Sequence, residues 1–280
     1  MQNKNEVKIS KLEKIIYFFV KIKNDDIFAL AAQLAYYLIL SFFPFLIFLI
    51  TLIGIAKFDS ITVIYGLKSI LPDNVFNLVQ KTVFEILNQQ NVGLFGISII
   101  LSMWSASSGA RAAIRGINKA YDLKERRNFI NLSFLAIIFT IALTLIIIIT
   151  LIALVFGDII DDYLYLWFPF PQVIKLIWNL IRYGLVIVAM IFIFASLYRY
   201  APTKKIKWKR VLPGAVFTSI GWIIASLAFS YYVNNISNYS SLYGSLGAVF
   251  VLMIWLYLTS IILILGAEIN SALDTNKNKF

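Results

Sequence analysis

The sequence predicts an all-α integral membrane protein, a bundle of six transmembrane helices with both termini on the cytoplasmic side. Of its 280 residues, 60% are hydrophobic, whereas soluble domains contain roughly 45–50%. These apolar residues come in blocks, and a helix needs about 20 apolar residues to cross a bilayer. The basic residues gather in alternate connectors between the blocks, which is the pattern that orients membrane proteins.

Six apolar blocks account for the predicted crossings, and polar connectors separate them. The blocks cover residues 27–56, 92–110, 130–157, 174–198, 211–233 and 243–269. The longer blocks can tilt or bend to fit the bilayer. We therefore expect a single transmembrane domain over residues 27–270.

Two further segments show helical periodicity without being apolar enough to cross the membrane. Residues 1–26 carry six lysines and predict a basic amphipathic helix on the cytoplasmic membrane surface, or else an N-terminal extension of the first span. The 57–91 connector predicts an amphipathic helix on the outer side, lying in the interface or over the mouth of the bundle. Residues 271–280 form a short polar cytoplasmic tail.

The distribution of lysine and arginine predicts the orientation of the chain. Twenty of them lie in the N-terminal segment, the second and fourth connectors and the C-terminal tail, whereas three lie in the 57–91 connector. Because basic loops stay in the cytoplasm, both termini are expected there. We interpret the net charge of +11 as a sign of this topology and of contact with anionic lipid headgroups at the cytoplasmic face, not of nucleic-acid binding.

The composition argues against an enzyme and against bound cofactors. The chain has no cysteine and no histidine, so it lacks disulfides, thiolate chemistry, the commonest metal ligand and the usual general base near neutral pH. Its 14 acidic residues are scattered among short connectors. We therefore predict no catalytic residue, no metal site and no cofactor.

Five ordered sequence blocks resemble the BrkB/YihY family of bacterial inner-membrane proteins, sometimes labelled ribonuclease BN-like. They are Leu34-Ala35-Tyr36-Tyr37 with Ser41-Phe42-Phe43-Pro44; Trp104-Ser105-Ala106-Ser107-Ser108 with Ala113-Ile114 and Asn118-Lys119-Ala120-Tyr121; Tyr198-Arg199 with Ala201-Pro202 and Pro213-Gly214-Ala215; Tyr239-Ser240-Ser241-Leu242-Tyr243-Gly244-Ser245-Leu246-Gly247; and Gly266-Ala267-Glu268-Ile269-Asn270. The resemblance implies a six-helix, multi-pass protein of the bacterial plasma (inner) membrane, of a family often described as transporter-like. A metal-dependent ribonuclease needs a cluster of histidine and carboxylate ligands, and a chain without histidine does not offer one.

Eight polar or helix-bending residues at membrane depth are candidates for lining a substrate path. They are Gln33, Tyr37, Ser41, Pro44, Ser102, Ser105, Ser108 and Arg182. Hydroxyl groups in hydrocarbon need partners, and kinked helices supply free backbone groups at transporter sites. The alternative is ordinary helix packing through small residues and interhelical hydrogen bonds, with Arg182 reaching to the membrane surface. The sequence leaves both interpretations open.

Glu268, at the end of the sixth span, is the candidate for an ion pair with Arg111 or Arg115, which follow the second span on the same side. Such a pair would be structural or would act as a gate.

The predicted function is a transporter or permease for a small anionic or amphiphilic substrate such as a lipid, with a cavity lined by the first, second and sixth spans. The alternative is a non-transporting envelope scaffold or accessory protein. Assembly into a homo-oligomer is left open by the sequence.

Overall fold

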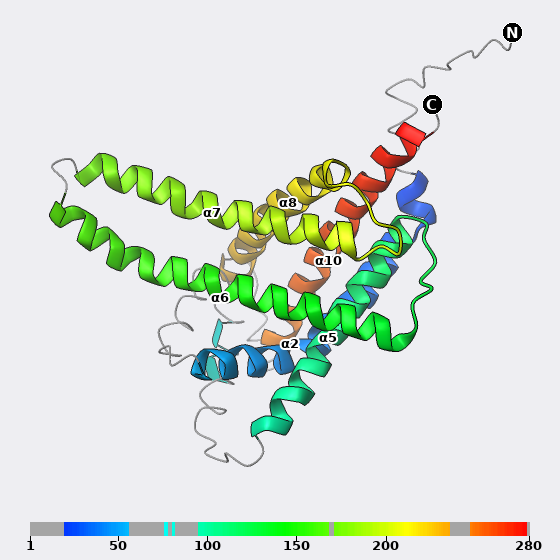
Figure 1. Ribbon diagram of the computed structural model, residues 1–280, viewed down its shortest axis with the longest axis horizontal. Helices are drawn as coiled ribbons and strands as arrows, with labels where there is room; N and C mark the ends of the chain where they lie inside the picture. Colours follow the sequence, from blue (N-terminus) through cyan, green and yellow to red (C-terminus); the bar gives the residue numbers. More distant parts are fainter. Residues whose placement is uncertain are drawn as a thin grey trace, which may run out of the picture.

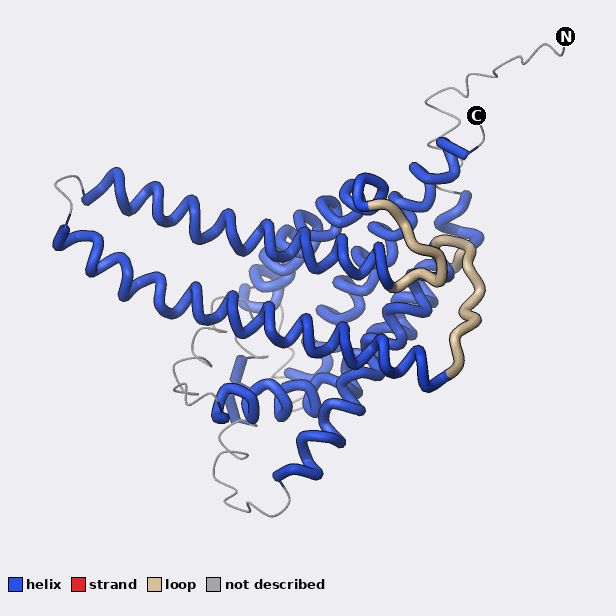
Figure 2. Tube along the Cα trace, viewed as in Figure 1, coloured by secondary structure: helices blue, strands red, loops and turns tan. Residues whose placement is uncertain are grey.

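The described part of the chain is entirely helical. The computed structural model describes residues 20–55, 76–77, 80–81, 95–167, 171–235 and 247–278, and no strand occurs within these ranges. The long helices are α2 (Ile27–Ile55), α5 (Phe95–Ala120), α6 (Phe129–Trp167), α7 (Pro171–Tyr200), α8 (Trp208–Asn235) and α10 (Gly247–Asn278). Figures 1 and 2 show that these long helices make up nearly all of the described structure. Each overlaps one of the six predicted apolar blocks.

Within the residues that the structure describes, four of these helices are long and apolar enough to cross a membrane. The spans are Phe129–Ile148, Tyr183–Tyr200, Trp208–Val233 and Val249–Leu273. The faces of α6 and α7 also expose many large apolar side chains, such as Ile130, Phe134 and Leu180. A water-soluble protein does not tolerate an apolar surface of this extent, so the chain is a multi-pass membrane protein.

The helices run beyond the apolar blocks at several ends. α5 continues to Ala120, past the predicted block end at residue 110, and α10 continues through most of the segment predicted as a tail. Hydropathy reports which residues lie in lipid, but a helix continues wherever its backbone hydrogen bonds do. The basic residues Arg111, Arg115 and Lys119 therefore sit on a helix and not in a loop.

The six long helices pack in a ring. Each contacts the next along the chain, and α10 closes the ring by packing on α2 and on α5 as well as on α8. In the apolar span of α10, 44% of the residues are buried, against 11% in that of α7. Of the four spans, that of α10 is therefore the most buried and that of α7 the most exposed.

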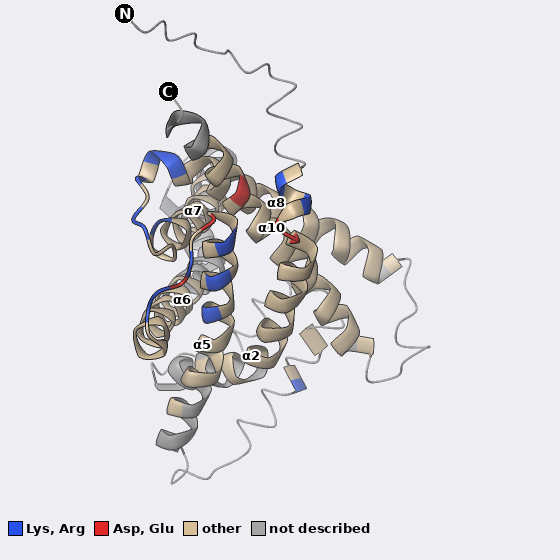
Figure 3. Ribbon diagram, turned by 90° about the vertical axis from the view of Figure 1, so that its right-hand side faces the viewer, with Lys and Arg blue, Asp and Glu red and all other residues tan. Residues whose placement is uncertain are grey.

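The helices converge at one end of the bundle and spread apart toward the other (Figure 1). Lysine and arginine residues gather at the convergent end (Figure 3). We call it the charged end and define it by residues 20–26, 118–128, 198–215 and 266–270. The larger apolar core lies at this end and draws on all six long helices, with Ile114, Tyr198 and Ile264 among its fully buried members. Packing is thus tightest where the basic connectors meet.

A second apolar core joins α2, α8, α10 and one residue of the long connector. Phe76 is buried in this core, which also contains Val251 and Trp255, while Asn77 and Lys81 are exposed. An amphipathic helix over the connector as a whole stays a prediction. The rest of that connector, and residues 1–19 of the predicted N-terminal amphipathic segment, lie outside the described residues.

Candidate functional site

A small polar cleft lies between α2 and α5. Its lining is Leu30, Gln33, Leu34 and Tyr37 from α2, and Ala112, Arg115 and Gly116 from α5. The cleft encloses about 10 Å³, which is room for about one water molecule. It brings a guanidinium, an amide and a phenol hydroxyl together between two helices, and these groups can all donate hydrogen bonds to an anion.

The cleft ends where the two helices come into close contact. A Cβ atom placed on Gly109 of α5 would lie 2.7 Å from Ser41 Oγ and 2.9 Å from Leu38 Cδ2 of α2. Ser41 is buried and donates a hydrogen bond to the carbonyl oxygen of Leu38 at 3.1 Å. Ser41 and Gly109, about one turn beyond Tyr37 and Ala112, therefore mark a close approach of α2 and α5, which we call the constriction.

The structure places the predicted path residues of α2 on this interface. Gln33 and Tyr37 line the cleft, Ser41 forms the constriction, and Pro44 is half-buried farther along α2, which continues as a helix through the proline. Arg115, which was predicted for an ion pair, also lines the cleft. The spacing of four residues between Gln33, Tyr37 and Ser41 explains why they share one face.

The serines of α5 form bonds within their own helix. Ser108 Oγ donates to the carbonyl of Ser105 at 2.6 Å, and Ser107 Oγ donates to that of Trp104 at 2.7 Å. Such local bonds satisfy hydroxyl groups inside an apolar bundle. Ser105 is half-buried, whereas the side chains of Ser102 and Arg182 lie outside the described residues. The α5 serines are thus less available to a substrate than the cleft residues.

Glu268 is ion-paired, but the predicted partners were wrong. Its Oε2 lies 3.0 Å from Lys21 Nζ, whereas Arg111 donates to Ser107 Oγ at 2.7 Å and lies over the rings of Trp104 and Phe129. Arg115 is exposed and faces the cleft. The pairing was missed because Lys21 belongs to a lysine-rich segment that was interpreted as a surface helix.

Lys21 is the centre of an ionic cluster in which Lys21, Asp25 and Glu268 are buried and Asp122 is exposed. Its Nζ donates to Asp25 Oδ2 at 2.8 Å, to the Ala120 carbonyl at 2.9 Å and to Asp122 Oδ2 at 3.2 Å. Lys21 is 7% exposed and Glu268 is 0% exposed. Burial opposes the charged form of Lys21, but the bond to Asp25 and the charges of Glu268 and Asp122 outweigh it, so the pKa of Lys21 is raised. The cluster connects the segment before α2 to the end of α5 and to Glu268 of α10.

The end of α5 is shaped to reach this cluster. Leu123 N donates to the Asn118 carbonyl and Asp122 N to the Lys119 carbonyl, both at 2.9 Å. Asp122 has φ 55°, the left-handed conformation that closes a Schellman motif. The cation of Lys21 also meets the last carbonyls of α5, where the helix dipole favours positive charge.

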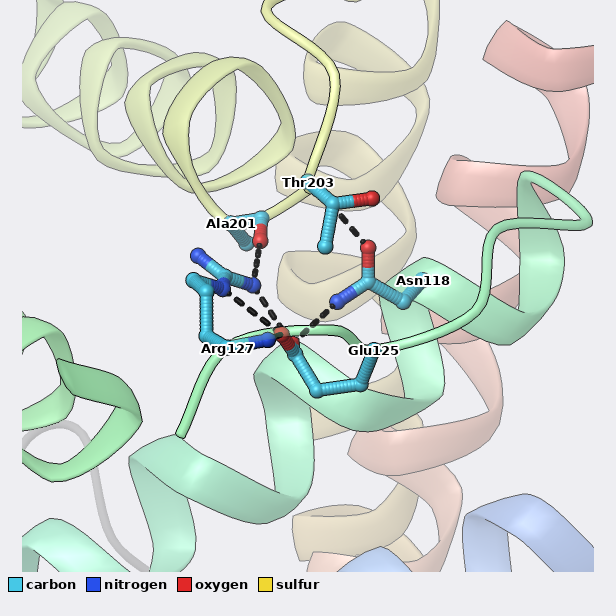
Figure 4. A network of polar contacts seen from close by, with 5 residues as sticks. All are labelled: Asn118, Glu125, Arg127, Ala201 and Thr203. Carbon is cyan, nitrogen blue, oxygen red and sulfur yellow. Dashed lines mark hydrogen bonds and ion pairs between the residues drawn. The ribbon is translucent and has the colours of Figure 1, made fainter. Parts of the chain in front are cut away.

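A second polar network joins the two basic connectors (Figure 4). Arg127 donates two hydrogen bonds to the Glu125 carboxylate, from Nε to Oε1 at 2.8 Å and from Nη2 to Oε2 at 2.6 Å. Arg127 Nη2 also donates to the Ala201 carbonyl at 2.7 Å. Asn118 donates to Glu125 Oε2 at 2.8 Å and accepts from Thr203 N at 2.9 Å. The α5–α6 connector is therefore tied to the α7–α8 connector at the charged end.

The Glu125 network predicts a loss of stability in acid. Burial raises the pKa of Glu125, but the bonds from Arg127 outweigh it, so the pKa lies below its ordinary value of 4.5. The ionised carboxylate therefore stabilises the fold at every pH above 4.5. This contribution is lost as the pH falls from 4.5 through the lowered pKa of the folded chain. We expect Glu125→Gln to unfold more easily than the unmodified chain by about 2 kcal/mol at pH 7, with the gap narrowing at pH 4. Thermal unfolding in detergent measures the gap, and a gap independent of pH would contradict the assignment.

α8 and α10 cross with almost no space between their backbones. A Cβ atom on Gly214 would overlap the carbonyl oxygen of Gly266, and one on Gly266 would overlap Thr218 Oγ1 and lie 2.5 Å from the Tyr198 hydroxyl. Tyr198 is fully buried and its hydroxyl meets Thr218 Oγ1 and the Leu263 carbonyl, each at 2.7 Å. These contacts lock α7, α8 and α10 together.

Asn270 forms hydrogen bonds with backbone groups near the start of α8, next to a proline. Pro213 lies inside α8, and proline disturbs the helical bonding of the preceding turn. Asn270 Oδ1 accepts from Gly214 N at 2.7 Å, and Asn270 Nδ2 donates to the Val211 carbonyl at 3.1 Å. The side chain thus satisfies backbone groups of α8 from α10.

The sequence blocks that carry the family resemblance meet in these contacts. The blocks 118–121, 198–202, 213–215 and 266–270 supply the buried polar groups of the charged end. They contain the glycines of the close α8–α10 crossing and the asparagine, tyrosine and glutamate side chains of the buried polar contacts. Among the described residues, no group of three or more acidic, histidine or cysteine side chains is arranged to hold a metal ion.

Comparison with known proteins gives the same family. The family model described as "Virulence factor BrkB" matches residues 18–279. The putative ribonuclease-like protein YfkH of Bacillus subtilis is 40% identical over 247 residues, which is 88% of this chain and 90% of that protein. A UPF0761 membrane protein of Methylibium petroleiphilum is 33% identical over 99 residues, or 35% of this chain and 23% of its own length. No solved structure matches the chain. With the family model covering nearly the whole multi-pass helical chain, this protein belongs to the BrkB family of membrane proteins.

Proposed function

We propose that this chain is a bacterial inner-membrane permease that moves a small anionic or amphiphilic substrate along the interface of α2 and α5. The cleft of Gln33, Tyr37 and Arg115, closed on one side by Ser41 and Gly109, is the observation that carries the proposal. A polar recess that stops at a small-residue constriction is what a permeation path looks like in a closed state. Separation of α2 from α5 at Gly109 would extend the cleft along the bundle.

The proposal includes six membrane crossings with both termini in the cytoplasm. The support for this topology is the position of the helix ends. Successive long helices alternately begin and end at the charged end, so that both basic connectors and the segment before α2 lie on the same side of the bundle. The positive-inside rule then places the charged end in the cytoplasm. In this orientation the cleft lies on the cytoplasmic half of α2 and α5.

The charge of the cleft favours an anion. Arg115 is the cation that lines it, and a guanidinium presents several donors in one plane to a carboxylate or phosphate. Tyr37 and Gln33 add neutral donors on the facing helix. Arg182 was the predicted source of this preference, but its side chain is outside the described residues, so Arg115 now takes that role in the proposal.

Flux measurements on reconstituted protein test this function. Proteoliposomes are loaded with a panel of small organic anions or with a short-chain fluorescent phosphatidylglycerol, and release or leaflet exchange is followed. We expect Arg115→Gln to lower the flux of the transported probe about ten-fold, because a charge-assisted hydrogen bond contributes about 1.5–3 kcal/mol. Lys119→Gln removes the same charge from an exposed position one turn farther along α5 and is expected to leave flux unchanged.

Two outcomes would overturn the permease proposal. Flux no higher than in protein-free vesicles for every probe would favour the alternative of a non-transporting envelope scaffold. Equal flux in Arg115→Gln and Lys119→Gln would show that the α2–α5 cleft is not part of the substrate path.

We also propose that the chain is not a nuclease. The words "ribonuclease-like" belong to the putative name of the Bacillus subtilis relative. The proposal is supported by the absence of histidine from the sequence and by the ion pairs that occupy Asp25, Glu125 and Glu268. Carboxylates held by lysine and arginine are poorly placed to bind catalytic metal ions.

A further inference from the structure

An apolar groove runs between α7 and α8 on the outer surface of the bundle. The groove has a volume of about 310 Å³ and is open to the outside. Its lining is Val188, Ile191, Phe192 and Ala195 from α7 with Trp208 and Leu212 from α8. All six side chains are apolar or aromatic. A groove of this kind on a lipid-facing pair of helices suits an acyl chain lying along the helices.

One end of the groove is aromatic and lies at the charged end. Trp208 stacks on Phe192 with ring centroids 5.8 Å apart and meets the ring of Tyr200 edge-on at 6.2 Å. Tryptophan in such a position marks the boundary between hydrocarbon and headgroups. The rest of the groove extends from Trp208 toward Val188, into the apolar part of α7.

Positive charge surrounds this aromatic end. The segment from Arg199 to Arg210 contains six basic residues and no acid, and Lys207 and Lys209 on either side of Trp208 are exposed. The guanidinium of Arg199 lies 5.0 Å from the Trp208 ring centroid, and its Nε is buried without a hydrogen-bond partner among the described residues. Basic sites between transmembrane helices bind anionic lipid headgroups.

We propose that the α7–α8 groove binds an anionic phospholipid, with an acyl chain along Val188, Phe192 and Leu212 and the phosphate held by Lys207 and Lys209 beside Trp208. An apolar channel that leads to a cluster of cations complements a molecule with a chain and an anionic head. A neutral chain would use the groove alone, and free phosphate would use the cations alone. The lipid uses both.

The site is separate from the α2–α5 cleft. In the ring of helices α7 and α8 neighbour each other, while α2 contacts α5 and α10. The lipid site can therefore be present whether or not the chain transports a substrate. A binding measurement that involves no flux distinguishes the two proposals.

Lipid-dependent stability of the purified full-length chain tests the site. The melting temperature, Tm, is measured in detergent with added dioleoyl phosphatidylglycerol, dioleoyl phosphatidylcholine or inorganic phosphate. We expect phosphatidylglycerol to raise Tm by about 5 °C and the other two to raise it by less than half as much. Native mass spectrometry is expected to show one tightly retained phosphatidylglycerol.

Two kinds of variant separate the groove from the charge. Val188→Trp fills the groove from an exposed position, and Leu185→Trp adds the same ring one turn away on α7, outside the groove lining. Lys207→Gln with Lys209→Gln removes the headgroup cations, and Lys119→Gln with Lys124→Gln removes two charges elsewhere at the charged end. The groove and headgroup variants are each expected to lose more than half of the phosphatidylglycerol shift, and their controls to keep it.

Several results would refute the lipid site. One is an equal shift with phosphatidylcholine, and another is a full shift with phosphate alone. A third is a phosphatidylglycerol shift that survives both Val188→Trp and the double lysine variant. If Val188→Trp itself lowers Tm without lipid, the double lysine variant, at two exposed positions, decides the outcome. A change of oligomeric state in Val188→Trp with lipid binding intact would identify the groove as a protein contact instead.

Discussion

Lys21→Met is expected to destabilise the fold by about 3–5 kcal/mol, the usual consequence of removing one member of a buried ion pair. The substitution keeps the length of the side chain but removes the cation that lies within 3.0 Å of both Asp25 and Glu268. Glu268 is fully buried and would lose its ionic partner. Urea or thermal unfolding in detergent measures the loss.

Companion variants separate the buried charge from general effects of the segment. Lys23→Met changes an exposed lysine two residues away and is expected to shift stability by less than about 0.5 kcal/mol. Lys21→Met combined with Glu268→Gln is expected to recover part of the loss, because a neutral amide tolerates burial better than an unpaired carboxylate. If Lys21→Met behaved like Lys23→Met, the cluster would not be a buried contact.

Gly266→Ala is expected to cost about 3 kcal/mol or more and to lower the yield of folded protein. The added methyl group overlaps Thr218 Oγ1 and lies 2.5 Å from the Tyr198 hydroxyl, so α8 and α10 must move apart or the buried hydrogen bonds must break. Overpacking of this kind usually costs about 1–3 kcal/mol, and here it is compounded by the loss of buried polar contacts. Gly214→Ala is expected to be at least as severe, because its methyl group meets the backbone carbonyl of Gly266.

Two other helical glycines provide matched controls. A Cβ atom on Gly184 of α7 has no neighbour within 4 Å, and one on Gly116 of α5 would be 3.6 Å from Ile264 Cδ1, an ordinary contact. Alanine stabilises a helix by about 1 kcal/mol relative to glycine, so both variants are expected to be neutral or slightly stabilising. A loss in Gly184→Ala as large as in Gly266→Ala would contradict the close α8–α10 crossing.

Helix α2 connects the Lys21 cluster to the proposed substrate path. This helix begins directly after Asp25 and Asp26, which belong to the Lys21 cluster and its turn, and it carries Gln33 and Tyr37 two to three turns later. The cluster therefore holds the start of α2 against the end of α5. Movement at Ser41 and Gly109 would then pivot about the fixed charged end.

Much of the fold could be predicted from the chain alone. Hydropathy located all six long helices, because crossing or lying in lipid imposes a local requirement on about 20 consecutive residues. The helical repeat placed Gln33, Tyr37 and Ser41 on one face, and the structure puts that face against α5. The boundaries of α5 and α10 were less accurate, since basic residues can continue a helix out of the apolar region.

Which helices meet, and which side chains meet between them, was decided only by the tertiary structure. Glu268 pairs with Lys21 and not with Arg111, because α10 passes beside the segment before α2 at the charged end. The α7–α8 groove is equally invisible in the sequence, where Val188 and Phe192 look like any lipid-facing residues. Hydropathy and periodicity describe one helix at a time, whereas ion pairs, crossings and grooves depend on how separate helices approach each other in space.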